Sequence, residues 1–332
     1  MSTKKTYLVT GGLGFIGLNF IEYLLKKFSN INVINIDSMV YPTAAKNLEH
    51  LASFENHHFV KLDITDRSSL EKLFKDYDFD VVVHFAAESH VDTSIINPGS
   101  FIDTNIVGTF NLLDISKNYI ADNNLDQNNF RLHHISTDEV YGSLSASDPS
   151  FKETNKYFPN SPYSASKASS DHLVRAYFHT FGMPITISNC SNNYGPFQHP
   201  EKLIPKTIIY GLQKKNIPIY GNGKNIRDWL HVRDHAECLF EIAQKGKKGQ
   251  TYNIGSKNEL TNIEIVKRIC KILDEKTKSN FKHKNLITFI NDRPGHDLRY
   301  AINPKKINKL INWYPKIEFY KGLDETIDWY LS

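Results

Sequence analysis

A glycine-rich loop between a predicted strand and a predicted helix is the feature that most restricts the fold of this chain. Residues 7–10 suit a buried strand, and residues 15–28 follow a helical pattern. Between them, the spacing Gly12-x-Gly14-x-x-Gly17 matches a loop that binds the pyrophosphate of a dinucleotide. Glycines permit a tight turn and a close approach of the backbone, and the helix N-terminus supplies N–H groups to the phosphates. The chain is therefore predicted to begin with a dinucleotide-binding βα unit.

Strand and helix patterns alternate through the first half of the chain. Short β-rich runs suited to buried parallel strands occur at residues 7–10, 33–37, 59–62, 81–85 and 132–136. Helical patterns lie between them, and the one at residues 100–119 carries a stripe of four apolar residues, Ile102, Ile106, Phe110 and Leu113. Residues 184–189 are predicted to add a further strand. This alternation predicts an α/β fold with a doubly wound, Rossmann-like parallel sheet.

The second half of the chain is less regular, with proline-bearing loops and a few helical patterns, such as residues 263–273 and 323–330. We expect a dinucleotide-binding domain over residues 1–189, rejoined by about residues 225–246. Residues 190–332 are expected to form a smaller C-terminal α/β domain that binds the substrate.

Composition excludes several classes of protein. The 332 residues carry 40 basic and 36 acidic side chains, and no segment concentrates basic and aromatic residues, so nucleic acid is not an expected partner. No apolar stretch approaches the roughly 18 residues of a membrane helix, and we expect a soluble, cytoplasmic protein without a membrane partner. Cys190, Cys238 and Cys270 are far apart and the histidines lack metal-ligand spacing, so no metal is expected.

Acidic and small residues at the ends of predicted strands are further candidates for contact with the dinucleotide. Asp37 lies twenty residues after Gly17, where a carboxylate binds ribose hydroxyls and repels a 2′-phosphate, which favours NAD over NADP. Alternatively, Asp37 caps the following turn. Asp63 ends the third strand and either approaches the adenine or caps a helix. Residues 85–87 either let the backbone lie against the cofactor or reflect tight packing.

Tyr163 and Lys167 form a pair with the spacing of one helical turn, in a predicted helix opened by Pro162. We expect the ammonium to favour the phenolate and lower the pKa of Tyr163, so that this phenol acts as a base at neutral pH. Lys167 is also expected to hold the nicotinamide ribose. Such a spacing is common in helices, and it gains weight here because the helix follows the strand that ends near Thr137.

Two neighbouring carboxyls, Asp138 and Glu139, follow Thr137 at the carboxyl end of that strand, where parallel sheets bind ligands. Neighbours in a strand point to opposite faces, so the chain must leave the extended conformation at about Thr137 for both to reach one ligand. The alternative is a solvated acidic pair at a helix start. A tyrosine and lysine with a dinucleotide can oxidise an alcohol. Two further carboxyls then allow the ketone to lose water, because one removes a carbon-bound proton and the other protonates the departing hydroxyl.

Together these residues resemble the extended short-chain dehydrogenase/reductase family, and within it the nucleoside-diphosphoglucose 4,6-dehydratases. The resemblance spans almost the whole chain and lies in residues 10–17, 84–92, 104–105, 136–142, 162–171, 189–196, 200–205, 227–231 and 293–297. Related epimerases and decarboxylases keep the tyrosine and lysine but not the Thr-Asp-Glu segment. The resemblance favours dTDP-glucose as the substrate and leaves UDP-glucose as the alternative.

The resemblance implies a mechanism for these positions. Tyr163 takes the proton of the sugar 4-hydroxyl while hydride passes from C4 to NAD, and Thr137 hydrogen-bonds the 4-oxygen. Glu139 removes the C5 proton, and Asp138 protonates the 6-hydroxyl, which leaves as water. Hydride then returns to C6 and Glu139 returns a proton to C5. The product would be a 4-keto-6-deoxy sugar nucleotide.

The resemblance also implies the ligand contacts. NAD is expected to contact Gly11, Gly14, Phe15, Ile16, Gly17, Asp37, Asp63, Ile64, Phe85, Ala86, Ala87, Thr104, Tyr163, Lys167 and Asn193. The nucleoside-diphosphate sugar is expected to contact Ser89, Thr137, Asn192, Lys202, Leu203, Pro218, Tyr220, Arg227, Asn258, Arg293 and His296. A homodimer is expected through a four-helix bundle that takes residues 100–119 and 163–181 from each subunit.

Two other functions remain open at this point. A sugar-nucleotide 4-epimerase or dehydrogenase on the same fold would leave Asp138 and Glu139 without a role. A non-catalytic NAD-sensing regulator would need the glycine loop but would have no use for Tyr163, Lys167 and the two acids.

Overall fold

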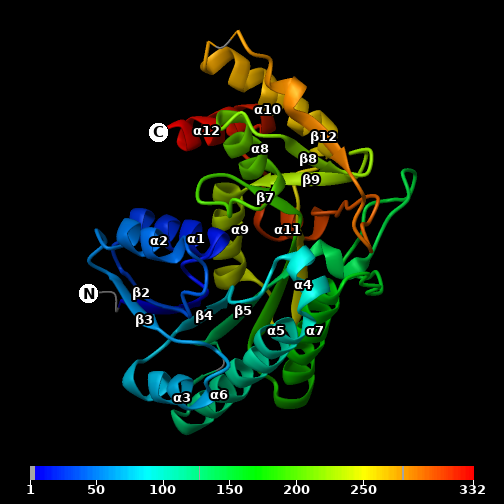
Figure 1. Ribbon diagram of the computed structural model, residues 1–332. Coiled ribbons are helices and arrows are strands. Elements are labelled where there is room, and N and C mark those ends of the chain that lie inside the picture. Colours follow the sequence, from blue (N-terminus) through cyan, green and yellow to red (C-terminus); the bar gives the residue numbers. More distant parts are fainter. Residues whose placement is uncertain (1–3, 127, 279) are drawn as a thin grey trace.

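The centre of the protein is a parallel sheet of seven strands in the order β10-β6-β5-β4-β1-β2-β3 (Figure 1). The structure is a computed structural model that describes residues 4–126, 128–278 and 280–332. The strands of this sheet are β1 (Lys5–Thr10), β2 (Ile31–Asp37), β3 (His57–Lys61), β4 (Val81–His84), β5 (Arg131–Thr137), β6 (Ile185–Cys190) and β10 (Gln250–Ile254). All adjacent pairs run parallel. The order reverses beside β1, as in doubly wound folds, which confirms the predicted fold class.

Alternate residues of each central strand enter different cores. Tyr7 and Val9 of β1 pack into one apolar cluster, whereas Leu8 between them packs into another on the opposite face. Both faces are therefore buried, and this explains why the strands are continuous apolar runs in the sequence. The six strands predicted for this sheet are confirmed, with ends that differ by one or two residues.

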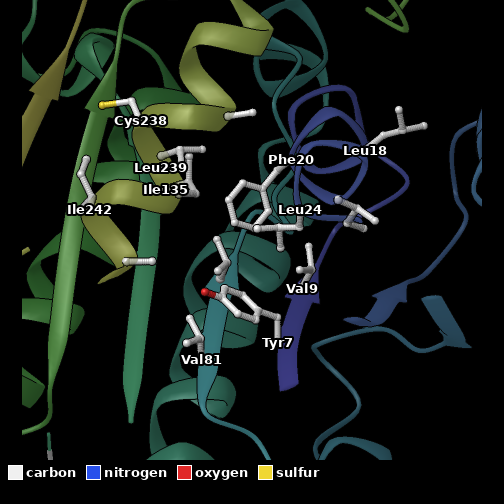
Figure 2. Packing of buried hydrophobic residues seen from close by; sticks show 14 of the residues in the cluster. Tyr7, Val9, Leu18, Phe20, Leu24, Val81, Ile135, Cys238, Leu239 and Ile242 are labelled. Atoms are coloured by element: carbon white, nitrogen blue, oxygen red, sulfur yellow. The ribbon is translucent and has the colours of Figure 1, made fainter. Parts of the chain in front are cut away.

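Helices cover both faces of the sheet. On one face, α1 (Phe15–Lys27) and α9 (Val232–Lys245) pack together over β1 and β4, and Figure 2 shows Phe20 and Leu24 of α1 close to Leu239 of α9. On the other face lie α3 (Arg67–Asp76), α6 (Thr109–Asp122) and α7 (Pro162–Phe181). α9 follows α1 by some two hundred residues in the chain, so this packing ties the second half of the sequence to the first.

The segment predicted as one helix over residues 100–119 is interrupted. It comprises the end of α5 (Pro98–Phe101), a π-helical segment η1 (Ile102–Gly108) and α6. Of the four apolar residues in the stripe, Ile102 and Phe110 are 48% and 40% exposed, and only Leu113 lies in the core. The buried face instead includes Asn105, which hydrogen-bonds to Glu88 in the segment after β4 and to Ser166 of α7.

Two small sheets and their helices form the remainder of the second half. β7 (Asn192–Tyr194), β9 (Ile226–His231) and β11 (Glu259–Thr261) make one sheet, and β8 (Ile217–Tyr220) pairs with β12 (Ile287–Ile290). A separate core lies among α8 (Leu203–Leu212), α10 (Asn262–Lys276) and α12 (Phe319–Leu331). Between these elements the chain returns to the large sheet through α9 and β10. The boundaries of the two predicted domains stay a prediction.

The remaining elements are short and lie in connections: α2 (Ala44–Leu51), α4 (Val91–Ile96), η2 (Asp138–Tyr141), η3 (His283–Leu286) and α11 (Lys305–Ile311). Within the described part of the chain, none of the helices has the length and apolar character needed to cross a membrane.

Candidate active site

A cavity of about 410 Å³ lies where the parallel strands of the large sheet end. Its walls come from the segments that follow β1, β2, β3, β4, β5 and β6, together with η1, the first turns of α7 and the loop before α8. This is the edge at which open parallel sheets bind ligands. Every residue that the sequence predicts to contact NAD lies on the wall of this cavity.

The glycine loop shapes one end of the cavity. Gly11 has a φ of +69°, and a Cβ there would lie 2.6 Å from the backbone N of Ala86, so the loop and the segment after β4 need a glycine to meet. Gly14 precedes α1, and a Cβ there would approach only the Gly11 carbonyl, at 3.2 Å. No side chain caps α1, so its first N–H groups remain available to an anion at the cavity wall.

Asp37 and Asp63 both line this end of the cavity. The sequence left open whether each carboxylate contacts the cofactor or caps a turn or helix, and the hydrogen bonds bear on that choice. Asp37 accepts hydrogen bonds from the backbone N–H groups of Leu13 (3.1 Å) and Met39 (2.8 Å), so it both organises the turn and faces the cavity. Burial raises the pKa of Asp37. Asp63 is not a helix cap, because the N-cap of α3 is Asp66.

The backbone of the Thr-Asp-Glu segment changes from strand to turn at the predicted position. β5 ends at Thr137, and η2 turns away from it at Asp138, which confirms the predicted change of backbone conformation. The Thr137 hydroxyl accepts from the N–H of Glu139 (3.3 Å) and donates to Asp138 Oδ1 (3.4 Å). Thr137 and Glu139 line the cavity, whereas Asp138 does not and is only 2% exposed. Its Oδ2 has no hydrogen-bond partner among the described residues.

Tyr163 and Lys167 reach the cavity from the first turns of α7. Ser161 and Ser164 form a capping box at the start of this helix, and Pro162 occupies its first position. The Lys167 ammonium donates to the carbonyl oxygen of Ile135 at 2.8 Å and so ties α7 to β5. The cap and this bond fix the position of the first two turns, which carry the tyrosine and the lysine.

The residues predicted to contact the sugar nucleotide divide into two groups. Four of them line the cavity: Ser89, Thr137, Asn192 and Lys202. The others lie outside its wall: Leu203, Pro218, Tyr220, Arg227, Asn258, Arg293 and His296. Arg227 donates to the backbone carbonyls of Ile226 and Asp297. Arg293 pairs with Asp92 at 3.0 Å, and its Nε has no partner among the described residues.

Comparisons with known proteins match this architecture. The family described as GDP-mannose 4,6 dehydratase matches residues 8–326. The chain belongs to this family. A dTDP-glucose 4,6-dehydratase from Neisseria meningitidis is 49% identical over 333 residues, which cover 99% of this chain and 94% of the relative. The resemblance predicted from the motifs is therefore confirmed, both for the family and for its similarity to members named dTDP-glucose 4,6-dehydratase.

Two solved structures are similar over nearly the whole chain. The crystal structure of dTDP-glucose 4,6-dehydratase from Bacillus anthracis, in complex with NAD, has a TM-score of 0.87 and 42% identity and covers 98% of this chain and 96% of its own. The enzyme of the same name from Streptomyces venezuelae, with NAD and TDP bound, has a TM-score of 0.88 and 39% identity, with 98% and 97% coverage.

In this member of the GDP-mannose 4,6 dehydratase family, the two neighbouring carboxyls have different environments. Burial, followed by the charges of Glu139 and Asp228, raises the pKa of Asp138 well above its ordinary value. Burial also raises the pKa of Glu139, but three cations oppose that rise: Arg293, Lys202 and Arg227. Asp138 is therefore the better proton donor and Glu139 the better carboxylate base.

The expectation that Lys167 lowers the pKa of Tyr163 is wrong for the protein without ligands. Burial raises the pKa of this phenol well above 10, and the charge of Glu139 adds to the rise. The Lys167 ammonium donates to the Ile135 carbonyl, and its own burial lowers its pKa to about 8. In this state Tyr163 keeps its proton at neutral pH.

Sequence reasoning missed several residues that line the cavity. Tyr41, Glu88 and His199 come from three separate loops and meet at the wall, where the Tyr41 hydroxyl donates to Glu88 at 2.7 Å and its ring contacts His199. Only Glu88 carried a signal, since it lies within the motif at residues 84–92. In the described residues, no group of three or more His, Cys, Asp or Glu side chains is placed to hold a metal ion.

Proposed function

We propose that this protein is an NAD-dependent hydro-lyase that converts dTDP-glucose to its 4-keto-6-deoxy product. The observation that carries the proposal is the pair of neighbouring carboxyls at the end of β5, which have different proton affinities and both lie close enough to Tyr163 to raise its pKa. An epimerase or a non-catalytic sensor gives this pair no task. The relatives named dTDP-glucose 4,6-dehydratase support the choice of reaction.

The cavity suits NAD in its chemistry. The uncapped start of α1 beside Gly14 fits a pyrophosphate, and the partly buried carboxylate of Asp37 fits ribose hydroxyls. Bound NAD would accept hydride from C4 of the sugar and return it to C6. Phe85, Ala86 and Ala87 would form the wall along the cofactor, and Lys167 would hold the second ribose.

Tyr163 is proposed to take the proton of the 4-hydroxyl, with Thr137 hydrogen-bonded to the 4-oxygen. Because the phenol has a raised pKa in the ligand-free protein, it must lose proton affinity before it can act as a base. A positive charge entering the cavity beside it has that effect. The proton leaves O4 as the C4–H bond breaks, and the 4-ketone then acidifies the proton on C5.

Elimination is assigned to the two carboxyls. Glu139 takes the C5 proton, and Asp138 gives its proton to the 6-hydroxyl as the C6–O bond breaks and water leaves. Glu139 then returns its proton to C5 while hydride is delivered to C6. The proton taken from O4 balances the proton that Asp138 lost, so the net change is the loss of one water from the sugar.

Cations near Glu139 support a diphosphate site beside the sugar. Lys202 lines the cavity, and Arg227 and Arg293 are close enough to lower the pKa of Glu139. Planar guanidinium groups suit phosphate oxygens. We assign the nucleotide end to the residues around them: Ser89, Asn192, Leu203, Pro218, Tyr220, Asn258 and His296. On this assignment, Arg293 exchanges its bond to Asp92 for one to phosphate.

The decisive experiment offers dTDP-glucose and UDP-glucose separately to the purified protein. We expect a product with the alkaline absorbance of a 4-keto-6-deoxy sugar from dTDP-glucose, and a higher kcat/KM than for UDP-glucose. A higher kcat/KM for UDP-glucose would assign the uridine nucleotide instead. Interconversion of sugars without loss of water would contradict the dehydratase.

A homodimer in the cytoplasm is part of the proposal. Apolar side chains on η1, α6 and α7 face solvent in the single chain, among them Val107, Phe110 and Phe181, and a helix-to-helix contact would cover them. Three buried free thiols suit a reducing compartment. Sedimentation should show a dimer that Phe110→Glu dissociates, whereas the control Tyr314→Glu, also at an exposed aromatic residue, should leave it intact.

A further inference from the structure

A row of ionisable side chains runs along α7 from the cavity into the interior. Tyr163, Lys167, Asp171 and Arg175 follow one another at intervals of four residues, so they lie on one face of the helix. The first two line the cavity. Asp171 is fully buried beneath them, and the proposed mechanism gives it no task.

Side chains from two other segments, β5 and the loop before α7, hold the Asp171 carboxylate in place. Ser136 of β5 donates to Oδ2 at 2.9 Å, and Tyr157 donates to the same oxygen at 2.7 Å. The Nε2 of His134 lies 3.1 Å from Oδ1. Arg175 donates to the Tyr157 hydroxyl at 2.6 Å and extends the network. Burial raises the pKa of Asp171, but His134 and the charges of Lys167 and Arg175 outweigh it and keep the pKa below its ordinary value.

Several titratable groups of the described residues interact with Lys167, and only one of them is anionic. These groups come from α7, β4, β5 and β6 and are Asp171, His84, His134 and Cys190. Burial lowers the pKa of both histidines and raises the pKa of the thiol to about 12. Tyr163 is protonated as well, so Asp171 supplies the negative charge.

We propose that Asp171 is a positioning residue that acts through Lys167: its buried carboxylate keeps the lysine charged beside Tyr163. The hydrogen bond from Lys167 to the Ile135 carbonyl orients the ammonium but offers no counter-charge. Burial already brings the pKa of Lys167 down to about 8, and Asp171 opposes a further fall. This inference rests on the proposed function, in which a charged Lys167 favours the ionised form of Tyr163.

The test compares pH profiles of the holoenzyme. With Asp171→Asn, the alkaline limb of kcat/KM should move down by about one to two pH units, and lowering the pH should restore much of the lost rate. Asp171→Glu keeps the charge and should keep the limb near its wild-type position. The matched control is Asp274→Asn. Asp274 lies on α10, outside the cavity, and its carboxylate hydrogen-bonds to His283, so its loss should not move the alkaline limb.

A uniform loss of rate in Asp171→Asn at every pH would overturn the inference and leave only a structural role. A direct readout that needs no turnover is NMR of 15N-lysine-labelled holoprotein, with the Lys167 signal identified by its loss in Lys167→Arg. We expect Lys167 to titrate near 8 in the wild type and lower in Asp171→Asn.

The same measurement separates the two proposals. If the wild type dehydrates neither sugar nucleotide, the proposed function fails, while the lysine titration still decides the role of Asp171. Should Asp171→Asn not fold, the wild-type protein suffices for the test, because a neutral Lys167 at pH 7 would overturn the inference.

Discussion

Asp138 and Glu139 are adjacent in the chain, but only Glu139 lines the cavity, and Asp138 is buried with one oxygen unpaired among the described residues. The 3-10 turn of η2 creates this difference by taking both residues out of the strand. Elimination needs one carboxyl protonated and the other ionised at the same pH. The separate environments supply the difference in proton affinity that an elimination requires.

Replacement of Glu139 should separate oxidation from elimination. Glu139→Gln keeps the shape of the side chain but removes the base, so reduced nicotinamide should accumulate while loss of water slows by about 10²- to 10⁴-fold. Absorbance of the reduced cofactor and exchange of the C5 hydrogen with solvent measure the two steps. As a control, Glu153→Gln changes a carboxylate bonded to the backbone of Asn253 and should eliminate normally. Normal water loss in Glu139→Gln would refute its assigned role.

Replacement of Tyr163 should act one step earlier. Tyr163→Phe removes the hydroxyl but keeps the ring that packs near Phe101, so the fold should persist. The initial reduction of bound cofactor by substrate should slow by about 10²- to 10⁴-fold. Stopped-flow absorbance measures this step. An undiminished first oxidation would mean that another group takes the 4-hydroxyl proton.

The two ends of the glycine loop should respond differently to alanine. Gly11→Ala places a Cβ against the Ala86 backbone at a positive φ and should destabilise the protein by roughly 2–4 kcal/mol. Gly14→Ala has an ordinary φ of −73°, and its Cβ would meet only the Gly11 carbonyl, at 3.2 Å, so stability should change by about 1 kcal/mol or less. Its methyl group enters the cavity, however, and NAD affinity should fall about tenfold or more.

Urea denaturation and calorimetric titration with NAD measure these two properties. Equal effects of the two substitutions on stability would contradict the geometry of the loop. Unimpaired NAD binding by Gly14→Ala would place the pyrophosphate elsewhere.

Buried neutral histidines should make the protein sensitive to acid. Burial lowers the pKa of His134 to about 4 and that of His235 to about 3. An unfolded histidine has a pKa of about 6.5, so between these values the unfolded chain binds protons that the native state does not. The free energy of unfolding should therefore fall as the pH drops below 6.5, by up to about 1.4 kcal/mol per pH unit for each histidine.

Urea denaturation between pH 7 and pH 5 measures this slope. The substitution His235→Asn should make it shallower, whatever its effect at pH 7, because one group that gains a proton on unfolding is gone. A slope equal to that of the wild type would show that His235 carries its charge in the native protein.

Local sequence was sufficient to predict the strands of the large sheet and the glycine loop at the cofactor end of the cavity. The strands of the large sheet are continuous apolar runs, and the glycine spacing specifies one kind of turn, so both could be predicted. The helix at residues 100–119 was harder, because a hydrophobic pattern does not reveal a π turn. Asn105 forms that turn's contacts with Glu88 and Ser166, which are remote in the chain.

The sequence by itself determined the doubly wound fold, the cofactor loop and the identity of the groups that could act on a sugar, because each depends on residue type and short-range spacing. Only the tertiary structure decided how those groups ionise. The pKa of Tyr163 is raised rather than lowered, and Asp171 adjoins Lys167 together with Ser136 and Tyr157 from other segments. Burial and the charges brought near by folding set proton affinity, and neither quantity exists in a sequence until distant segments pack together.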